Sequence, residues 1–306
     1  MSAAPAIEST PCAAPPGPGG HGAGWQARLE LQFEAAAART RLAHRRHRGP
    51  LMVQRAFYPE PPAPDDALAA QPCHVYVLHP PGGVVSGDEL ALEVEVRPQA
   101  HALLTTPAAG KFYRRIEHDG GAPRVARLTQ TLRVEGGVLE WLPQENIFYP
   151  QAAVALHTRV ALGAAARFIG WEIGCLGLPA SAAGLGGGTL RASFELWQGA
   201  TPLLLERQNI DRACLQALSG LAGHPALGTL LAYPAGAREL TLARARLAAM
   251  NCADMRLACT LVDGALSCRG MAARADRLKQ AFIDVWRALR AELLGRPAMP
   301  PRVWAT

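Results

Sequence analysis

Apolar and polar positions alternate along most of the chain, from Trp25 to about Tyr233. A period of two places alternate side chains on opposite faces of a strand, so it is typical of strands with one buried face. Turns rich in Gly or Pro separate these runs. The pattern therefore predicts a mainly β body. The clearest runs are 89–96, 128–134, 156–162 and 190–196, and the clearest turns are 80–83, 136–137 and 186–188.

The number and spacing of these strands leave the architecture of the body open. Many short strands at fairly regular spacing occur in sandwiches, in barrels and in solenoids. We find no clear sequence repeat of the kind that most solenoids show.

The C-terminal third predicts two helices with a β-hairpin between them. Residues 237–250 are rich in Ala, Leu and Arg, which are good helix formers. Strands are expected at 256–262 and 265–271, and the Asp263-Gly264 pair between them suits a hairpin turn. The second helix is expected at 274–294.

This second helix has a continuous apolar stripe. Gly295 suits its C-terminal cap, and Pro297 prevents the helix from continuing. The stripe packs either on the β body or into the groove of a partner. It consists of Leu278, Phe282, Val285, Leu289 and Leu293.

Length and composition limit the class of protein. A chain of 306 residues can bury a large core in one or two domains. Residues 1–24 are mostly Pro, Gly and Ala, which predicts a disordered tail. No apolar run approaches the roughly 18–20 residues of a membrane helix, and no secretory signal is visible. We therefore expect a cytoplasmic protein without a membrane partner.

Charge and cysteine content add little to this picture. The net charge is +6, and the one dense basic cluster, Arg39 to Arg48, is too short to favour nucleic acid over an acidic protein partner or a solvated face. Seven cysteines occur without a CxxC pair, which indicates free thiols in a reducing compartment. Cys252, Cys259 and Cys268 either converge on a metal or serve as small buried residues.

Three polar clusters stand at the ends of strand-like runs between residues 79 and 150. None of them is an enzyme signature, because the chain has no nucleophile elbow, phosphate loop or paired-histidine metal motif there. The clusters are Gly87-Asp88, then Thr105-Thr106 with Lys111, and finally Gln144-Glu145-Asn146.

The sequence around these clusters resembles that of the UreD family of urease accessory proteins, also called UreH. The matching segments read HPPGGVVSGD, LLTTPAAGKFYRR and LPQENI, followed by GWEIGCLGLPAS and the final PRVWAT. The resemblance covers roughly residues 49 to 306. It implies a single domain over 25–306, built as a β-helix-like body of solenoid or sandwich type with two helices near the C-terminus.

Two carboxylates in these segments are candidates for a functional role. Asp88 follows Gly87 at a turn, and Glu172 lies between Trp171 and Ile173 in an apolar stretch where burying a charge is costly. A structural interpretation has them anchor turns or pair with Arg or Lys. The resemblance implies a functional one, in which Asp88 and Glu172 line a transient path for Ni²⁺, an ion that accepts carboxylate ligands.

Further expectations concern Lys111, the other motif residues and two departures from the family pattern. Lys111 stands out in a chain that uses arginine almost everywhere, and it could neutralise Glu145 or Glu172. The remaining motif residues are expected to be structural or to bind partners. The chain departs from the family pattern at Leu178, where arginine is usual, and at Gly110.

The resemblance predicts a non-catalytic metallochaperone. It would bind the urease apoprotein and the accessory proteins UreF and UreG, with a dimer in the accessory complex as an option. Nickel would be in transit and no cofactor permanently bound.

Two alternatives stay open on the residues alone. One is a β-solenoid enzyme acting on carbohydrate, with Asp88 and Glu145 as its carboxylate pair. The other is a protein-binding module without a metal.

Overall fold

The computed structural model describes residues 24–62, 69–115, 124–250 and 254–305. The predicted tail, residues 1–24, lies outside the described residues apart from Gly24. In the described part, strands dominate up to residue 233 and the longer helices follow, so the prediction of a mainly β protein with two late helices is confirmed.

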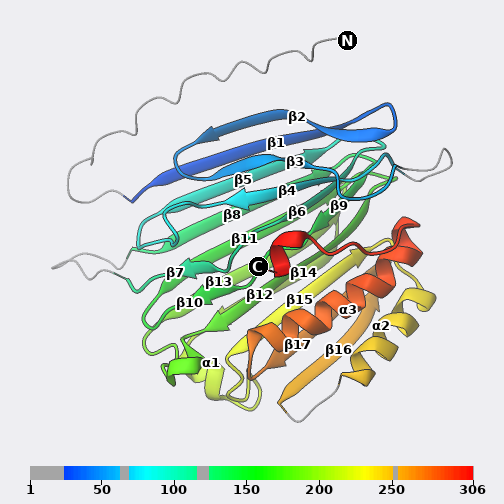
Figure 1. Cartoon of the computed structure of the whole chain (residues 1–306). Helices are drawn as coiled ribbons and strands as arrows, with labels where there is room; N and C mark the ends of the chain where they lie inside the picture. The colour runs from blue at the N-terminus through cyan, green and yellow to red at the C-terminus, as the bar shows by residue number, and fades with distance from the viewer. Residues whose placement is uncertain (1–23, 63–68, 116–123, 251–253, 306) are drawn as a thin grey trace.

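Two mixed sheets form the body (Figure 1). The first has seven strands in the order β14(Thr201–Ile210), β13(Thr189–Gln198), β11(Ala153–Leu162), β8(Ala126–Val134), β5(Glu89–Val96), β1(Gln26–Ala36) and β2(Arg39–Arg48). The second has ten. Its main path is β16(Met255–Val262), β17(Ala265–Ala272), β15(Ala226–Tyr233), β12(Arg167–Leu176), β9(Val138–Trp141), β6(His101–Thr105), β4(Cys73–Leu78) and β3(Met52–Phe57). The short strands β7(Gly110–Phe112) and β10(Asn146–Phe148) extend beside β12.

Between β4 and β13 the chain passes back and forth between the two sheets. In the first sheet, β5, β8, β11 and β13 each lie parallel to an earlier strand of that sheet. Because parallel strands in register hold equivalent side chains side by side, inward-facing residues form rows across the sheet. These rows determine which polar groups meet between the sheets.

Two hydrophobic clusters hold the layers together. One fills the space between the sheets with the inward halves of the alternating strands, such as Leu92, Leu132 and Val160. The other lies between the ten-stranded sheet and the helices α2(Ala237–Ala249) and α3(Ala275–Leu294), which cover its outer face (Figure 1). The described helices also include the five-residue α1(Arg212–Gln216), which is too short for its pattern to be recognised in the sequence.

The predicted C-terminal elements are confirmed. Asp263 and Gly264 both have positive φ, as a two-residue hairpin turn between β16 and β17 requires. Gly295 ends α3 in the left-handed conformation, in which a Cβ atom would be strained. All five residues of the apolar stripe are buried, and α3 packs on β12, β15 and β17. The stripe is therefore part of the core.

Candidate functional site

A carboxylate lies between the two sheets. Glu172 projects from β12 of the ten-stranded sheet toward the seven-stranded one. There it accepts hydrogen bonds from the Thr158 hydroxyl on β11 and from Gln130 Nε2 on β8, the latter at 3.1 Å. In the described part of the chain no arginine or lysine pairs with it, so the ion pair that was one option of the structural interpretation is not seen for Glu172.

The surroundings of Glu172 change its acidity. Burial raises the pKa of this carboxyl to about 7, the hydrogen bonds from Thr158 and Gln130 oppose the shift, and the negative charge of Glu206 adds to it. Burial disfavours the charged form because the protein interior solvates it poorly. Glu172 therefore changes protonation state near neutral pH.

Glu206 on β14 is the second carboxylate of this region. It accepts hydrogen bonds from the Thr229 hydroxyl at 2.6 Å and from Gln208 at 2.7 Å. Arg269 on β17 pairs with it at 3.0 Å. Glu206 thus has the counter-charge that Glu172 lacks.

Strand register explains why these polar groups meet. Across the seven-stranded sheet, Gln130 is the register partner of Thr158, Thr158 of Phe194, and Phe194 of Glu206. Across the ten-stranded sheet, Glu172 is the partner of Thr229, and Thr229 of Arg269. Two rows of the same kind therefore face each other across the interior. The polar residues of both rows lie on faces of their strands that are otherwise apolar.

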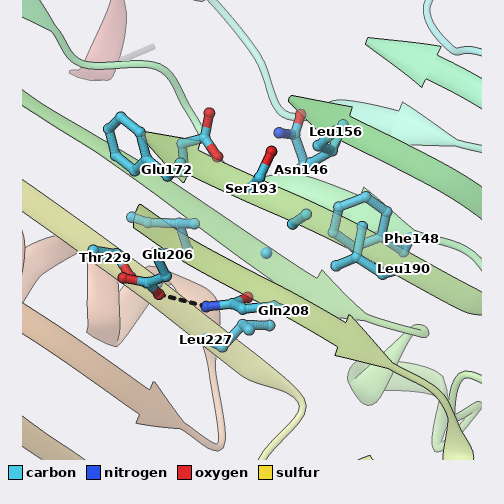
Figure 2. Close-up of a pocket in the computed structure, with 15 residues that line it drawn as sticks. Asn146, Phe148, Leu156, Glu172, Leu190, Ser193, Glu206, Gln208, Leu227 and Thr229 are labelled. Atoms are coloured by element: carbon cyan, nitrogen blue, oxygen red, sulfur yellow. Dashed lines mark hydrogen bonds between the residues drawn. The ribbon is translucent and has the colours of Figure 1, made fainter. Parts of the chain in front are cut away.

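A cavity of about 40 Å³ lies between these rows, with Glu172, Glu206 and Thr229 in its wall (Figure 2). Figure 2 also shows its apolar wall of Phe148, Leu190 and Leu227. About 10–15 Å³ is enough for one water molecule, so the cavity has room for water or a small ion.

The cavity adjoins a larger open groove of about 480 Å³. The groove runs between β14 and the strands β15 to β17, where the ten-stranded sheet extends beyond the edge of the other sheet. Glu206, Gln208 and Thr229 are among the residues that line both spaces. The inner carboxylates therefore lie next to a surface opening.

The structure places Asp88 apart from this cavity. Its two carboxylate oxygens accept the backbone N–H groups of Trp25 and Val85, at 2.8 and 2.9 Å. The preceding Gly87 has φ +87°, a conformation that favours glycine. Asp88 and Gly87 thus anchor the turn that leads into β5.

The other two polar clusters meet at the outer side of the ten-stranded sheet. The Thr105 hydroxyl donates to the Leu142 carbonyl, and Thr106 accepts the backbone N–H of Gln144. Lys279 on α3 binds the side chains of both Gln144 and Glu145. The motif segments therefore hold the C-terminal helix. The chain's other lysine, Lys279, neutralises Glu145, which differs from the role we expected for Lys111 on β7.

Trp171 belongs to the same helix-binding surface. Its indole N–H donates to the Pro143 carbonyl at 2.8 Å, and its ring packs against Phe282 and Trp304. Trp304, in the final PRVWAT segment, also donates to Thr105. Segments that lie far apart in the sequence thus form one contact region.

Asn146 connects this region with the cavity, because it lies in the cavity wall. It is the register partner of Gly110, where an added Cβ would come within 2.2 Å of Asn146 Oδ1. The absence of a side chain at Gly110 therefore leaves room for Asn146.

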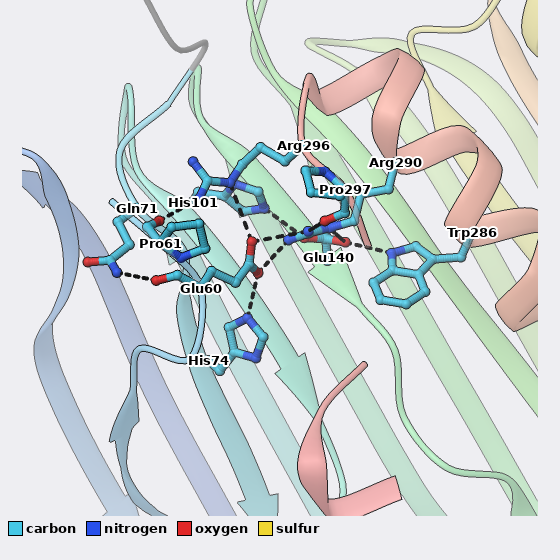
Figure 3. A network of polar contacts seen from close by, with 10 residues as sticks. All are labelled: Glu60, Pro61, Gln71, His74, His101, Glu140, Trp286, Arg290, Arg296 and Pro297. Atoms are coloured by element: carbon cyan, nitrogen blue, oxygen red, sulfur yellow. Dashed lines mark hydrogen bonds and ion pairs between the residues drawn. The ribbon is translucent and has the colours of Figure 1, made fainter. Parts of the chain in front are cut away.

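A second polar network ties α3 to the body (Figure 3). The fully buried Arg290 binds Glu140 and Glu60, and the shortest of these contacts to a carboxylate is the one to Glu60 Oε1, at 2.6 Å. His101 and His74 contact the same two carboxylates, at 2.7 and 2.8 Å. Further contacts come from Trp286, Arg296 and Pro297.

The pKa values of the two carboxyls in this network show that its basic groups balance their charge. Burial alone would raise the pKa of Glu60, but His74 and Arg290 lower it to about 2. Arg290 and His101 likewise hold the pKa of Glu140 well below its ordinary value, although burial opposes them. Both carboxylates are therefore ionised at neutral pH, and the network fixes the helix.

Comparison with known proteins identifies the family. The family model described as UreD urease accessory protein matches residues 26–305. The chain belongs to the UreD family. It is 41% identical over 290 residues to the urease accessory protein UreD of Alcanivorax borkumensis, covering 92% of this chain and 93% of that one. It is 42% identical over 287 residues to the UreD of Pseudomonas putida, covering 94% and 96%.

Membership establishes the general function. The protein is a urease accessory protein, a urease maturation factor that is itself non-catalytic. The alternative of a carbohydrate-active enzyme is therefore set aside. The two carboxylates proposed for that enzyme also lie in separate clusters, Asp88 at the turn before β5 and Glu145 at α3. No helix in the described ranges is long and apolar enough to cross a membrane.

Several polar residues at or beside the cavity of this UreD protein were not predicted from the sequence. Gln130, Thr158 and Glu206 each interrupt the apolar face of an alternating strand, a signal that can be read once the inward face is known. Among the described residues, no cluster of three or more His, Cys, Asp or Glu side chains could hold a metal ion. The cavity offers two carboxylates with hydroxyl and amide oxygens around them.

Proposed function

We propose that this protein assists nickel delivery into urease by passing the ion through the cavity between its sheets. The observation that carries the proposal is Glu172, a partly buried carboxyl that has no cationic partner among the described residues and faces a space of ionic size. A buried carboxylate without a counter-charge destabilises the fold. A passing cation would supply the missing charge.

The chemistry of the wall fits an ion in transit. Ni²⁺ accepts carboxylate and other oxygen ligands, although it prefers nitrogen and sulfur when it is held firmly. Oxygen ligands from Glu172, Glu206 and the Thr229 hydroxyl would therefore attract the ion without retaining it. Because the pKa of Glu172 is about 7, an approaching cation can displace its proton readily.

The groove beside β14 is the opening that we assign to this path. It shares Glu206 and Thr229 with the cavity, so an ion in the groove needs no rearrangement of the sheets to reach Glu172. Asp88, which the family resemblance also linked to nickel, is bound to two backbone N–H groups elsewhere. We therefore place Glu206 in the path and give Asp88 a turn-forming role.

The partners follow from family membership. We infer that residues 25–306 act as one domain that binds the urease apoprotein, UreF and UreG, with a dimer in the accessory complex as an option. The strands that alternate between parallel sheets support a β-helix-like body for this unit. The five described cysteines are free thiols, which supports a reducing compartment such as the cytoplasm.

The experiment is to measure nickel bound per urease molecule in cells that make the cognate urease, its other accessory proteins and one variant of this chain. Glu172→Gln keeps the shape and removes the charge. We expect a several-fold loss of nickel in urease, with urease and UreF still co-purifying with the variant. Glu135→Gln is the matched control, because Glu135 is exposed and pairs with Arg97 at the surface.

Normal nickel content with Glu172→Gln would refute the path through the cavity. Full nickel loading in cells that lack this chain altogether would refute the maturation role itself. The two results are distinct, because the first requires only the variant and the second requires deletion of the gene.

A further inference from the structure

The β16–β17 hairpin brings two cysteines face to face. Cys259 on β16 and Cys268 on β17 are register partners, and their Sγ atoms are 2.8 Å apart. Both are free thiols, and 6% of Cys259 and none of Cys268 is exposed. Neither lines the cavity or the groove, so the nickel path gives them no role.

The register of the hairpin suits a bond between them. The two-residue turn places Val262 opposite Ala265 as the closing, hydrogen-bonded pair. Pairs then alternate, so the third pair further on, Cys259 and Cys268, is a non-hydrogen-bonded one. Such pairs have Cα atoms about 4.5 Å apart, within the range of roughly 4.4–6.8 Å that disulfides span. A cross-link needs little movement of the backbone.

The two thiols differ in reactivity. A hydrogen bond from the Cys268 thiol lowers the pKa of Cys259, and the guanidinium of Arg244 on α2 acts in the same direction. The same hydrogen bond and burial raise the pKa of Cys268 well above its ordinary value. Because the thiolate is the nucleophile in disulfide exchange, Cys259 reacts first. It also lies on the edge strand of its sheet.

We propose that Cys259 and Cys268 form a reversible intrachain disulfide, which makes this hairpin a modification site for small-molecule disulfide oxidants. The Cys259 thiolate attacks one sulfur of the oxidant, forms a mixed disulfide and releases one thiolate. The sulfur of Cys268 then attacks Cys259 Sγ, loses its proton and expels the second thiolate. The pair loses two electrons, and the oxidant becomes two thiols that take up both protons.

The bond would lie beneath α2. Arg244 of that helix donates to the Cys259 carbonyl at 3.1 Å, and α2 packs on β16. The cross-link would therefore join the outermost two strands of the ten-stranded sheet under their covering helix. In a reducing compartment the pair stays as thiols, and intracellular disulfides of this kind are usually transient.

The experiment uses the reduced full-length protein and oxidised glutathione, followed by alkylation and digestion with trypsin without reduction. Cleavage after Arg256 and Arg269 leaves both cysteines on one peptide, residues 257–269, whereas Cys252 falls on residues 247–256. We expect peptide 257–269 to lose both alkyl groups and to become lighter by two hydrogen atoms. Dithiothreitol should reverse the change.

Matched variants separate this pair from the other thiols. Cys214→Ser should leave the cross-linked peptide unchanged, whereas Cys259→Ser or Cys268→Ser should abolish it. Three outcomes would overturn the proposal. They are full alkylation of peptide 257–269 after oxidation, a stable mixed disulfide with glutathione, and a cross-link from this peptide to Cys252 or another cysteine.

Discussion

At the scale of single residues, the main feature of the interior is the titratable carboxyl of Glu172. A hydroxyl and an amide group, from Thr158 and Gln130, donate hydrogen bonds to this carboxyl, and neither carries a charge. A leucine there would pack without electrostatic cost. The protein instead keeps an acid whose ionised form opposes folding, which is the pattern expected where function is favoured over stability.

The acid should make stability depend on pH. The pKa of Glu172 is about 7 in the folded state and ordinarily 4.5, so the native protein binds a proton that the unfolded chain has lost. This contribution is complete below pH 4.5 and is lost as the pH rises through 7. Glu172→Gln should therefore raise the free energy of unfolding at pH 8 by about 1–3 kcal/mol relative to wild type.

Denaturant unfolding of both proteins at pH 5 and pH 8 measures this difference. The gain should shrink at pH 5, where wild-type Glu172 is already protonated. An equal effect of the substitution at both pH values would show that the folded pKa is not raised.

At the residue level, the sequence singled out Glu172 as a candidate but did not point to its hydrogen-bond partners. Glu172 stands out because it interrupts a continuous apolar stretch. Gln130 and Thr158 lie in strands with many polar residues, and only strand pairing shows that they share the inward face. The neutral environment of Glu172 likewise depends on contacts 14 and 42 residues away in the chain.

At the scale of elements, α3 is held by charge as well as by its apolar stripe. Arg290 reaches from the helix to Glu140 on β9 and to Glu60 in the segment after β3. Removing one partner from such a buried network leaves uncompensated charges in the interior, which costs far more than losing a surface ion pair.

Arg290→Met should therefore destabilise the protein by about 3–5 kcal/mol, because Glu60 and Glu140 would keep their burial without their cation. Arg287→Met is the control on the same helix, since Arg287 is half exposed and pairs with Asp284 at the surface. It should change stability by less than about 1 kcal/mol. Chemical denaturation measures both, and equal effects would contradict the anchoring role of Arg290.

The elements themselves were predicted well where the signal is local. Both long helices, the hairpin and its Asp263-Gly264 turn depend on residues that are neighbours in the sequence. The order of strands in the two sheets depends on pairing between distant segments, for which alternation carries no information. The Arg290 network was missed for the same reason, since Glu60 lies 230 residues before it.

At the scale of the whole molecule, the two sheets enclose a space and leave one side of it open. The ten-stranded sheet extends past β14, and the groove formed there meets the inner cavity. The two long helices, α2 and α3, cover the outer face of that sheet (Figure 1), whereas Cys214 of the short α1 lies in the wall of the groove. A non-catalytic protein of this shape can hold partners on its surface while an ion passes inside.

Blocking the cavity tests this account most directly. Ala192 on β13 lies in the cavity wall, and Ala192→Leu would fill the space without touching either carboxylate's charge. Ala155→Leu is the matched control, because its register partners Arg127 and Arg191 are on the exposed face of the same sheet. Both variants should still co-purify with urease and UreF.

The decisive measurement is the nickel content of urease matured with each variant. We expect a several-fold lower nickel content with Ala192→Leu and a wild-type content with Ala155→Leu. Wild-type nickel loading with Ala192→Leu, in a protein whose cavity is shown to be filled, would contradict the path through the cavity. The ion would then have to reach urease along the outside of the protein.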